Sequence, residues 1–174
     1  NEAGFQWGDE RQTLRVVAFR NKYSNLIADN PDNPFNRINI GAASNLGQEI
    51  TYKKMIQDGA VRLTWVHQNP KDDVSNTALL KRAAHFFSAG YSEKIDAWQV
   101  ETSARYTGQR HDRYQGTDEI LQSYWLLDVA VSRPITRQTL WYGRIDNVTN
   151  KDYSPAYGYH VLRRTLITGL RISF

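Results

Sequence analysis

Histidine, serine and carboxylate side chains are the residues of this chain that could carry catalytic or metal-binding chemistry. The four histidines, His67, His85, His111 and His160, lie far apart, and no two have the spacing of a metal site. The chain has no cysteine, so thiolate ligands and disulfides are excluded. No nucleophile elbow, phosphate-binding loop or dinucleotide fingerprint occurs. We therefore expect neither an enzyme nor a bound metal or cofactor.

Aromatic and polar residues in the long connections could instead bind a ligand. A concave site holds a large ligand by aromatic stacking together with a few placed polar groups. We expect ligand contacts from Tyr114, Gln115, Tyr157, Tyr159 and His160. The alternative interpretation is that the tyrosines are ordinary residues of a rim or of a membrane-interface ring.

The elements that must position these residues are β-strands. Apolar and polar residues alternate with period two along most of the chain, and no segment shows helical spacing over three turns. The pattern predicts an all-β chain of about nine antiparallel strands. Their approximate bounds are 1–7, 12–28, 36–57, 60–68, 79–93, 97–111, 122–134, 138–148 and 163–174.

Short and long connections alternate between these strands. The short ones lie at 8–11, 58–59, 93–96 and 134–137, and Asp58-Gly59 is a strong signal for a tight hairpin turn. The long ones lie at 29–35, 69–78, 112–121 and 149–162. In an up-and-down meander all short turns fall on one rim and all long loops on the other, as in transmembrane β-barrels.

Tryptophans fall near both ends of the expected strands. Trp98 and Trp141 lie toward the short turns, together with the terminal Phe174, whereas Trp65 and Trp125 lie toward the long loops. Two such groups are typical of the aromatic girdles at the two surfaces of a membrane. Several strands also reach the roughly nine to eleven residues that cross a bilayer at a tilt. We therefore favour a membrane barrel over a soluble sandwich or lipocalin-like barrel.

The polar face of the strands carries charges at mid-strand. In a membrane barrel that face lines the lumen, where charges pair with each other, with water or with a plug. The residues expected there are Arg62, Glu101, Arg105, Asp128, Arg144, Asp146 and Arg171. On the opposite, lipid side, Leu170, Ile172 and Phe174 end the chain, and we expect this terminal strand edge to be recognised by the barrel-assembly machinery through strand addition.

An open sheet cannot lie in lipid, because its edges would expose unpaired backbone groups. We expect strands from an earlier part of a longer chain to close the barrel. A self-contained barrel of about eight strands is the less favoured alternative, if 1–7 is not a strand. The first five residues show no secretory signal. The formal charge of +4 is spread among acidic residues, so we do not expect a nucleic-acid partner.

Four stretches resemble TonB-dependent outer-membrane receptors, specifically those of the cobalamin (vitamin B12) type. Within them, Val148-Thr149-Asn150 and Leu162-Arg163-Arg164 depart from the family's usual residues. The stretches are FRNKYSNLI (19–27), LLKRAAHFFSAGY (79–91), ARYTGQRHDRY (104–114) and the closing RIDNVTNKDYSPAYGYHVLRRTLITGLRISF (144–174).

This resemblance implies that residues 1–174 are the C-terminal part of a barrel of about 22 strands, closed by an N-terminal plug. The plug and the first barrel strands are not in this sequence. The expected location is the bacterial outer membrane, where the receptor would take up cobalamin and be opened by TonB through the absent N-terminal part. The alternatives are a receptor for an iron siderophore or haem, and a small structural or adhesive barrel.

Overall fold

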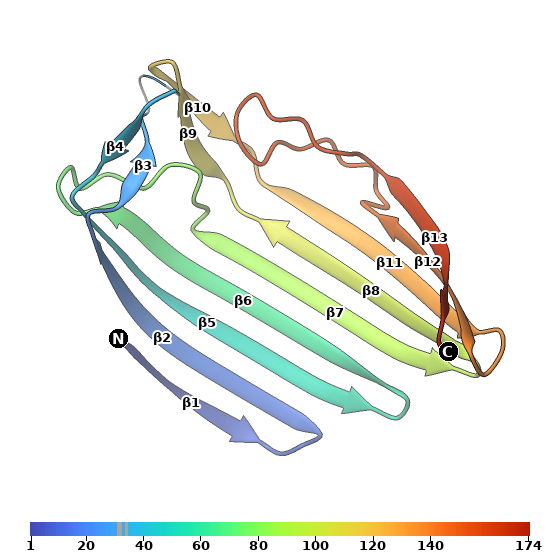
Figure 1. The fold of residues 1–174 in the computed structure, drawn as a ribbon. Helices are drawn as coiled ribbons and strands as arrows, with labels where there is room; N and C mark the ends of the chain where they lie inside the picture. Colours follow the sequence, from blue (N-terminus) through green and yellow to red (C-terminus); the bar gives the residue numbers. More distant parts are fainter. Residues whose placement is uncertain (31–32, 34) are drawn as a thin grey trace.

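The computed structural model describes residues 1–30, 33 and 35–174, and β-strands are the regular elements within them (Figure 1). This confirms the expected all-β, antiparallel fold. Among the described residues, no helix is long and apolar enough to span a membrane. Nine of the described strands form one sheet in the order β1-β2-β5-β6-β7-β8-β11-β12-β13. They are β1 (Glu2–Gly8), β2 (Gln12–Ser24), β5 (Ala42–Ile56), β6 (Gly59–Asp72), β7 (His85–Ile95), β8 (Trp98–Thr107), β11 (Tyr124–Pro134), β12 (Thr139–Asp146) and β13 (Thr165–Ile172).

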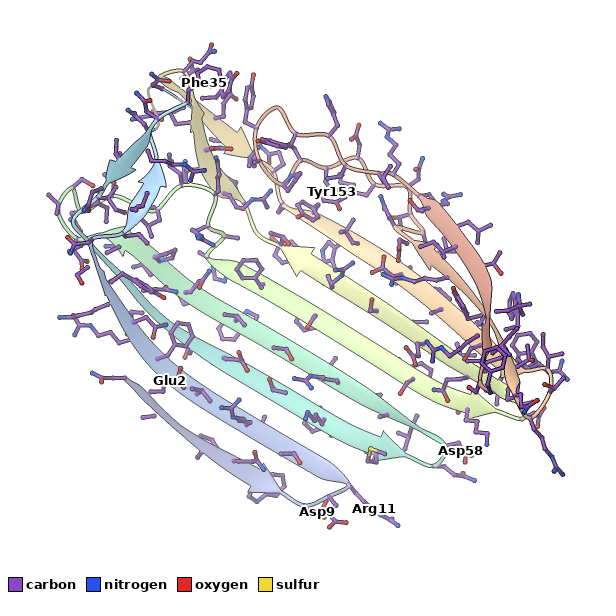
Figure 2. The ribbon with its side chains drawn as sticks, viewed as in Figure 1. Glu2, Asp9, Arg11, Phe35, Asp58 and Tyr153 are labelled. Atoms are coloured by element: carbon purple, nitrogen blue, oxygen red, sulfur yellow. The ribbon has the colours of Figure 1, made fainter. Side chains whose placement is uncertain are left out.

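The sheet is a meander that curves across its width, with β1 and β13 as its two edges (Figure 1). Its short turns lie together at one end and its longer connections at the other, as the sequence predicts. Figure 2 labels Asp9, Arg11 and Asp58 at the short-turn end and Phe35 and Tyr153 at the opposite, loop end. The C-terminus also lies at the short-turn end (Figure 1).

Polar side chains shape the first short turn. Asp9 Oδ1 accepts hydrogen bonds from the backbone N–H groups of Arg11 (2.8 Å) and Gln12 (2.9 Å). A short carboxylate that bonds backbone groups two and three residues ahead favours a turn over a continuing strand. In the third short turn, between β7 and β8, Asp96 takes a positive φ of 53°.

Two short hairpins interrupt the expected strands and loops. The expected strand 12–28 is wrong after Ser24, because Asn25 takes a left-handed φ of 55° and ends β2. A hairpin of β3 (Ile27–Asp29) and β4 (Arg37–Asn39) follows. Residues 31, 32 and 34 of the loop expected there lie outside the described residues. The expected loop 112–121 is wrong as well, because β9 (Arg110–Tyr114) and β10 (Thr117–Leu121) form a second hairpin.

The expected strand 79–93 begins later than predicted. Lys81 has a φ of 62°, and its N–H donates to the carbonyl of His111 at 2.7 Å. Residues 79–84 therefore leave the regular strand, and only isolated bonds join them to β6, such as the one from the Leu79 N–H to the Pro70 carbonyl. The preceding strand is correspondingly longer, since β6 continues to Asp72 instead of ending at 68.

Cross-strand pairing aligns aromatic residues on one face of the sheet. Trp65 pairs with Phe87, Phe87 with Tyr106, and Tyr106 with Trp125, and we call these four residues the loop-side aromatic row. The Trp125 ring lies 5.1 Å from that of Tyr106 and 5.7 Å from that of Phe87. We call the face that carries this row the outer face and the opposite face the inner face.

A second aromatic group lies near the short turns on the same outer face. The rings of Trp98 and Trp141 meet edge to face with 5.9 Å between centroids, and the Arg133 guanidinium lies 5.3 Å from the Trp98 ring centroid. Tyr106 and Trp98, on β8, are eight residues apart, which is roughly 26 Å along a strand. With the tilt of about 40° that barrel strands have, the two groups lie roughly 20 Å apart in height, close to the apolar band of about 25 Å.

Candidate functional site

The β9/β10 hairpin begins the group of residues that builds the loop end of the sheet. Its turn residues Gln115 and Gly116 have φ values of 49° and 80°. Positive φ at both central positions defines a type I′ turn, whose twist matches that of the paired strands. Arg110 and Asp112 lie two residues apart in β9, and only 4% and 2% of their surfaces are exposed.

Arg110 holds the connection between β12 and β13, residues 147–164, which we call the final loop. Its Nη2 donates to the carbonyl oxygen of Ser154 at 2.7 Å, and its Nη1 donates to that of Gly108 at 3.3 Å. The guanidinium also lies 5.3 Å from the ring centroid of Tyr124, which stacks on Tyr153 at 4.4 Å. The buried cation is therefore solvated by two carbonyls and an aromatic face.

Asp112 holds the same loop one step farther along. Its carboxylate accepts hydrogen bonds from the N–H groups of Tyr157 and Arg113, both at 2.8 Å. The Lys81 ammonium lies 4.0 Å from the same carboxylate. One buried side chain thus links the hairpin, the final loop and the segment before β7.

Asn147 starts the final loop from the top of β12. It takes a φ of 53°, and its side chain donates to the Lys151 carbonyl and accepts from the Lys151 N–H, both at 2.8 Å. Its own N–H donates to Asp128 Oδ1 on β11 at 2.9 Å. The loop is therefore tied to the sheet at its beginning and to the hairpin at its middle.

A hollow of about 370 Å³ opens between the final loop and the chain that joins β10 to β11. Its wall combines aromatic rings with one carboxylate, one ammonium group and one imidazole. Burial raises the pKa of Tyr153 above its ordinary value, with the neighbouring Tyr124 as a second cause. The residues used below line it: Tyr124, Lys151, Asp152, Tyr153, Tyr159 and His160.

The residues expected to contact ligand fall into three places at this end of the sheet. Tyr159 and His160 line the hollow. Tyr114 and Tyr157 bring their rings to 5.6 Å of each other, which joins the hairpin to the final loop. Gln115 lies in the hairpin turn and is not part of the hollow's wall. Ligand contact by each of them remains a prediction.

The residues expected to face the lumen share the inner face. Register places Arg62 level with Gly90, Gly90 level with Ser103, and Ser103 level with Asp128. The others follow at even spacings or in paired positions: Glu101, Arg105, Arg144, Asp146 and Arg171. Their shared face is an observation, and its role as a lumen lining is a proposal.

Ion pairs organise this inner face. Arg105 bonds Asp128 at 2.6 Å, and Arg144 bonds Asp146 at 2.5 Å. A second hollow of about 450 Å³ is lined by Arg62, Glu101, Asp128 and Arg144 among others. Since a hollow forms on the concave side of a curved sheet, the charged face is the one around which the sheet curves.

Sequence reasoning missed the side chains that hold the final loop. Arg110 and Asp112 lie within ARYTGQRHDRY (104–114), one of the stretches that resemble the receptor family, yet no role was assigned to them. Their spacing of two places both on the same side of a strand, which is the signal that could have paired them. The sequence around Asn147 contains no comparable signal.

Comparison with known proteins shows which family this architecture resembles. The family model described as TonB dependent receptor-like, beta-barrel, matches residues 1–148. The solved ferric-catecholate import receptor Fiu from E. coli K12 is similar, with 23% identity and a TM-score of 0.75 over 99% of this chain and 27% of that one. The siderophore receptor PirA from Acinetobacter baumannii has 16% identity and a TM-score of 0.82 over 99% and 31%.

The copper transporter OprC is a third similar structure, with 13% identity and a TM-score of 0.79 over 99% of this chain and 30% of that one. The chain thus spans between 27% and 31% of the length of these three proteins. At such low identities the likeness shows a shared fold.

Proposed function

Because the chain belongs to the TonB-dependent receptor-like β-barrel family, we propose that it is part of an outer-membrane receptor that binds a metal chelate at its loop end and imports it. Receptors of this family transport their ligands and are not enzymes. The observation that carries the proposal is the hollow beside the final loop, where Tyr153, Tyr159 and His160 meet Asp152 and Lys151. Stacking surfaces beside a few placed polar groups suit a large, flat or aromatic ligand.

The outer face supports the membrane location. Its aromatic and aliphatic side chains are exposed in the described chain, with Trp125 at 50% and Leu170 at 58%. Contact with lipid tails would remove these apolar side chains from water. The sheet edges β1 and β13 carry unpaired backbone groups, which lipid does not tolerate. We propose that other strands of a longer chain close the barrel and that an N-terminal plug fills it.

The partners follow from the same proposal. TonB would act through the N-terminal part, beyond this sequence. The barrel-assembly machinery would pair with the terminal strand, where Leu170, Ile172 and Phe174 are exposed on the outer side of β13 and just beyond it. The inner charges from Arg62 to Arg171 would face the plug, and outer-membrane lipids would contact the outer face.

We place an iron siderophore first among the candidate ligands. The names of Fiu and PirA describe a ferric-catecholate import receptor and a siderophore receptor. Cobalamin is the second candidate, because the quoted sequence stretches resemble the cobalamin receptor type; haem remains an alternative. All are metal chelates with broad, partly apolar faces that aromatic rings can stack against.

Uptake by the complete receptor tests the proposal. It would be expressed in a Gram-negative host that lacks its own siderophore and cobalamin receptors, with and without TonB. We expect TonB-dependent uptake of a radiolabelled ferric catecholate. Uptake of radiolabelled cyanocobalamin instead would move the ligand to the second candidate. A receptor that reaches the outer membrane and takes up no metal chelate would overturn the proposal.

A further inference from the structure

Two histidines form a close pair on the outer face, near the loop end of β6 and β7. His67 and His85 lie directly opposite each other, and their ring centroids are 4.6 Å apart with 28° between the ring planes. The neighbouring Gln68 N–H donates to the Ala84 carbonyl at 2.9 Å. Hydrogen-bonded and non-hydrogen-bonded pairs alternate along an antiparallel ladder, so the two histidines occupy a non-hydrogen-bonded pair, in which side chains come closest.

One ring nitrogen of this pair has no partner. His67 Nδ1 is buried and forms no hydrogen bond to any residue that the structure describes. A buried polar atom without a partner is destabilising, and a bound ion or water is the usual way of satisfying it. The lone pair of a neutral imidazole nitrogen is also the group that binds a transition-metal ion.

The neighbours of the pair hold His67 in place and leave space around His85. The Trp65 ring stacks on His67 with 6.1 Å between centroids and 12° between the ring planes. On β8, the Gly108 N–H donates to the His85 carbonyl at 2.9 Å. A Cβ atom at residue 108 would lie 3.4 Å from the His85 Cβ, so a side chain there would fill the space beside His85. The glycine keeps that space open, and His85 is exposed.

Water reaches the pair from its polar neighbours. Gln48 lies level with His67 on β5, Asn69 lies two residues farther along β6, and both are exposed. Among the described residues, no group of three or more histidine and carboxylate side chains could hold a metal ion. A metal on the two histidines would therefore keep water in its remaining positions, as in an open coordination site.

The separation of the two rings suits a shared metal ion. Two imidazoles on one tetrahedral ion, each with its nitrogen about 2.1 Å from the metal, have ring centroids roughly 5 Å apart. The observed separation is 4.6 Å. The backbone therefore already holds the two rings at the distance that a common ion requires.

We propose that His67 and His85 together bind one divalent transition-metal ion on the outer face. Imidazole suits copper(II), nickel(II) and zinc(II), and copper(II) is bound most tightly in that series. The site is separate from the hollow proposed for the imported chelate, because neither histidine lines that hollow. The ion would join β6 to β7 where residues 79–84 leave the regular strand, and so would stabilise the loop end of this pairing.

Copper binding by the complete receptor tests this. The receptor, purified in neutral detergent without a chelate, would be titrated with copper(II) near neutral pH and followed by electron paramagnetic resonance. We expect a copper(II) signal that is split by two imidazole nitrogens. His67→Gln and His85→Gln should each weaken this binding by at least roughly tenfold, because a single imidazole loses the gain from two linked ligands.

His111→Gln is the matched control, because it removes an exposed histidine from the same end of the sheet. It should leave the copper affinity unchanged. Amide hydrogen exchange gives a second measurement, since copper(II) should slow exchange at Gln68 in the unaltered receptor and not in His67→Gln or His85→Gln.

Equal copper affinity in His67→Gln and the unaltered receptor would overturn the inference. Exchange at Gln68 that does not change when copper(II) is added would overturn it as well. Neither measurement depends on transport, so failure of the proposed function would show separately, as a receptor that binds copper(II) at this pair and takes up no metal chelate.

Discussion

Asp112, in the middle of β9, accepts a hydrogen bond from the N–H of Tyr157, 45 residues later in the chain, at 2.8 Å. Its carboxylate is 2% exposed, so the bond is shielded from water. Two residues earlier, Arg110 bonds the carbonyl of Ser154. The final loop that lines the hollow is therefore positioned by the hairpin of another loop.

Asp112→Ala should loosen the final loop while leaving the sheet folded. The N–H of Tyr157 would lose its acceptor, and an unsatisfied buried donor costs about 1–3 kcal/mol. Amide hydrogen exchange of the complete receptor should show faster exchange around 153–160 and unchanged exchange in β5 and β6. Glu10→Ala, an exposed carboxylate in the first short turn, serves as the control and should leave that segment protected.

Arg110→Lys should weaken the same attachment although the charge is kept. A lysine ammonium cannot donate to Gly108 and Ser154 and also present a flat face to Tyr124. We expect a loss of about 1–3 kcal/mol in the local stability of the final loop. Faster cleavage of residues 147–164 by a protease would report it. Arg137→Lys, in a short turn, should cleave at the unaltered rate.

The β9/β10 hairpin should loosen in acid. The hydrogen bond from Arg113 Nε, at 2.6 Å, lowers the pKa of Asp118 below its ordinary value. A carboxyl with a depressed folded pKa stabilises the hairpin fully above its unfolded pKa of about 3.9, and that contribution is lost as the pH falls through the folded pKa. Hydrogen exchange in 110–121 should therefore be constant from neutral pH to about 4 and rise below it, after correction for intrinsic rates. Asp118→Asn should abolish this change.

Neighbouring residues of β11 test which face meets lipid. Val129 lies on the outer face, midway between Trp125 and Arg133, while Ala130 lies on the inner face level with Glu101. Val129→Arg should destabilise the receptor in lipid vesicles by about 2–4 kcal/mol, the cost of arginine near the bilayer midplane. Ala130→Arg should cost much less. Equal losses in a urea titration would contradict the assignment of the faces.

Ligand affinity should depend on the hollow. Tyr159→Ala or His160→Ala should weaken binding of the imported chelate about tenfold, because each removes a stacking or polar surface from the wall. Gln115→Ala, in the hairpin turn outside the wall, should change the affinity less than threefold. Isothermal titration of the complete receptor would measure all three. A larger effect at Gln115 would place the ligand on the hairpin tip instead.

Most of the sheet could be predicted from the sequence because its signals are local. Alternation in segments such as 97–107 and turn residues such as Asp9 and Asp58 depend on near neighbours only. The β9/β10 hairpin was missed because its strand RHDRY has few apolar residues to alternate, although Gly116 marks its turn. The break at Asn25 was missed because the apolar pattern runs on past it into Ile27.

The site was harder to predict because its contacts are distant in sequence. The aromatic candidates Tyr159 and His160 could be chosen by type, and they do share one hollow. The reason that they share it lies in Arg110, Asp112 and Asn147, whose partners are backbone groups of other segments. Because almost every residue has a backbone N–H and a carbonyl, a backbone partner cannot be identified from the residue types in the sequence.

Every pairing in the main sheet joins strands that follow each other along the chain once the two small hairpins are set aside. Closing a short turn costs little chain entropy, so such a sheet can form one hairpin at a time. The bonds of Arg110 and Asp112 close much longer segments of 44 and 45 residues. We expect them to form after the strands around them, so the loop end acquires its shape only once the sheet has formed.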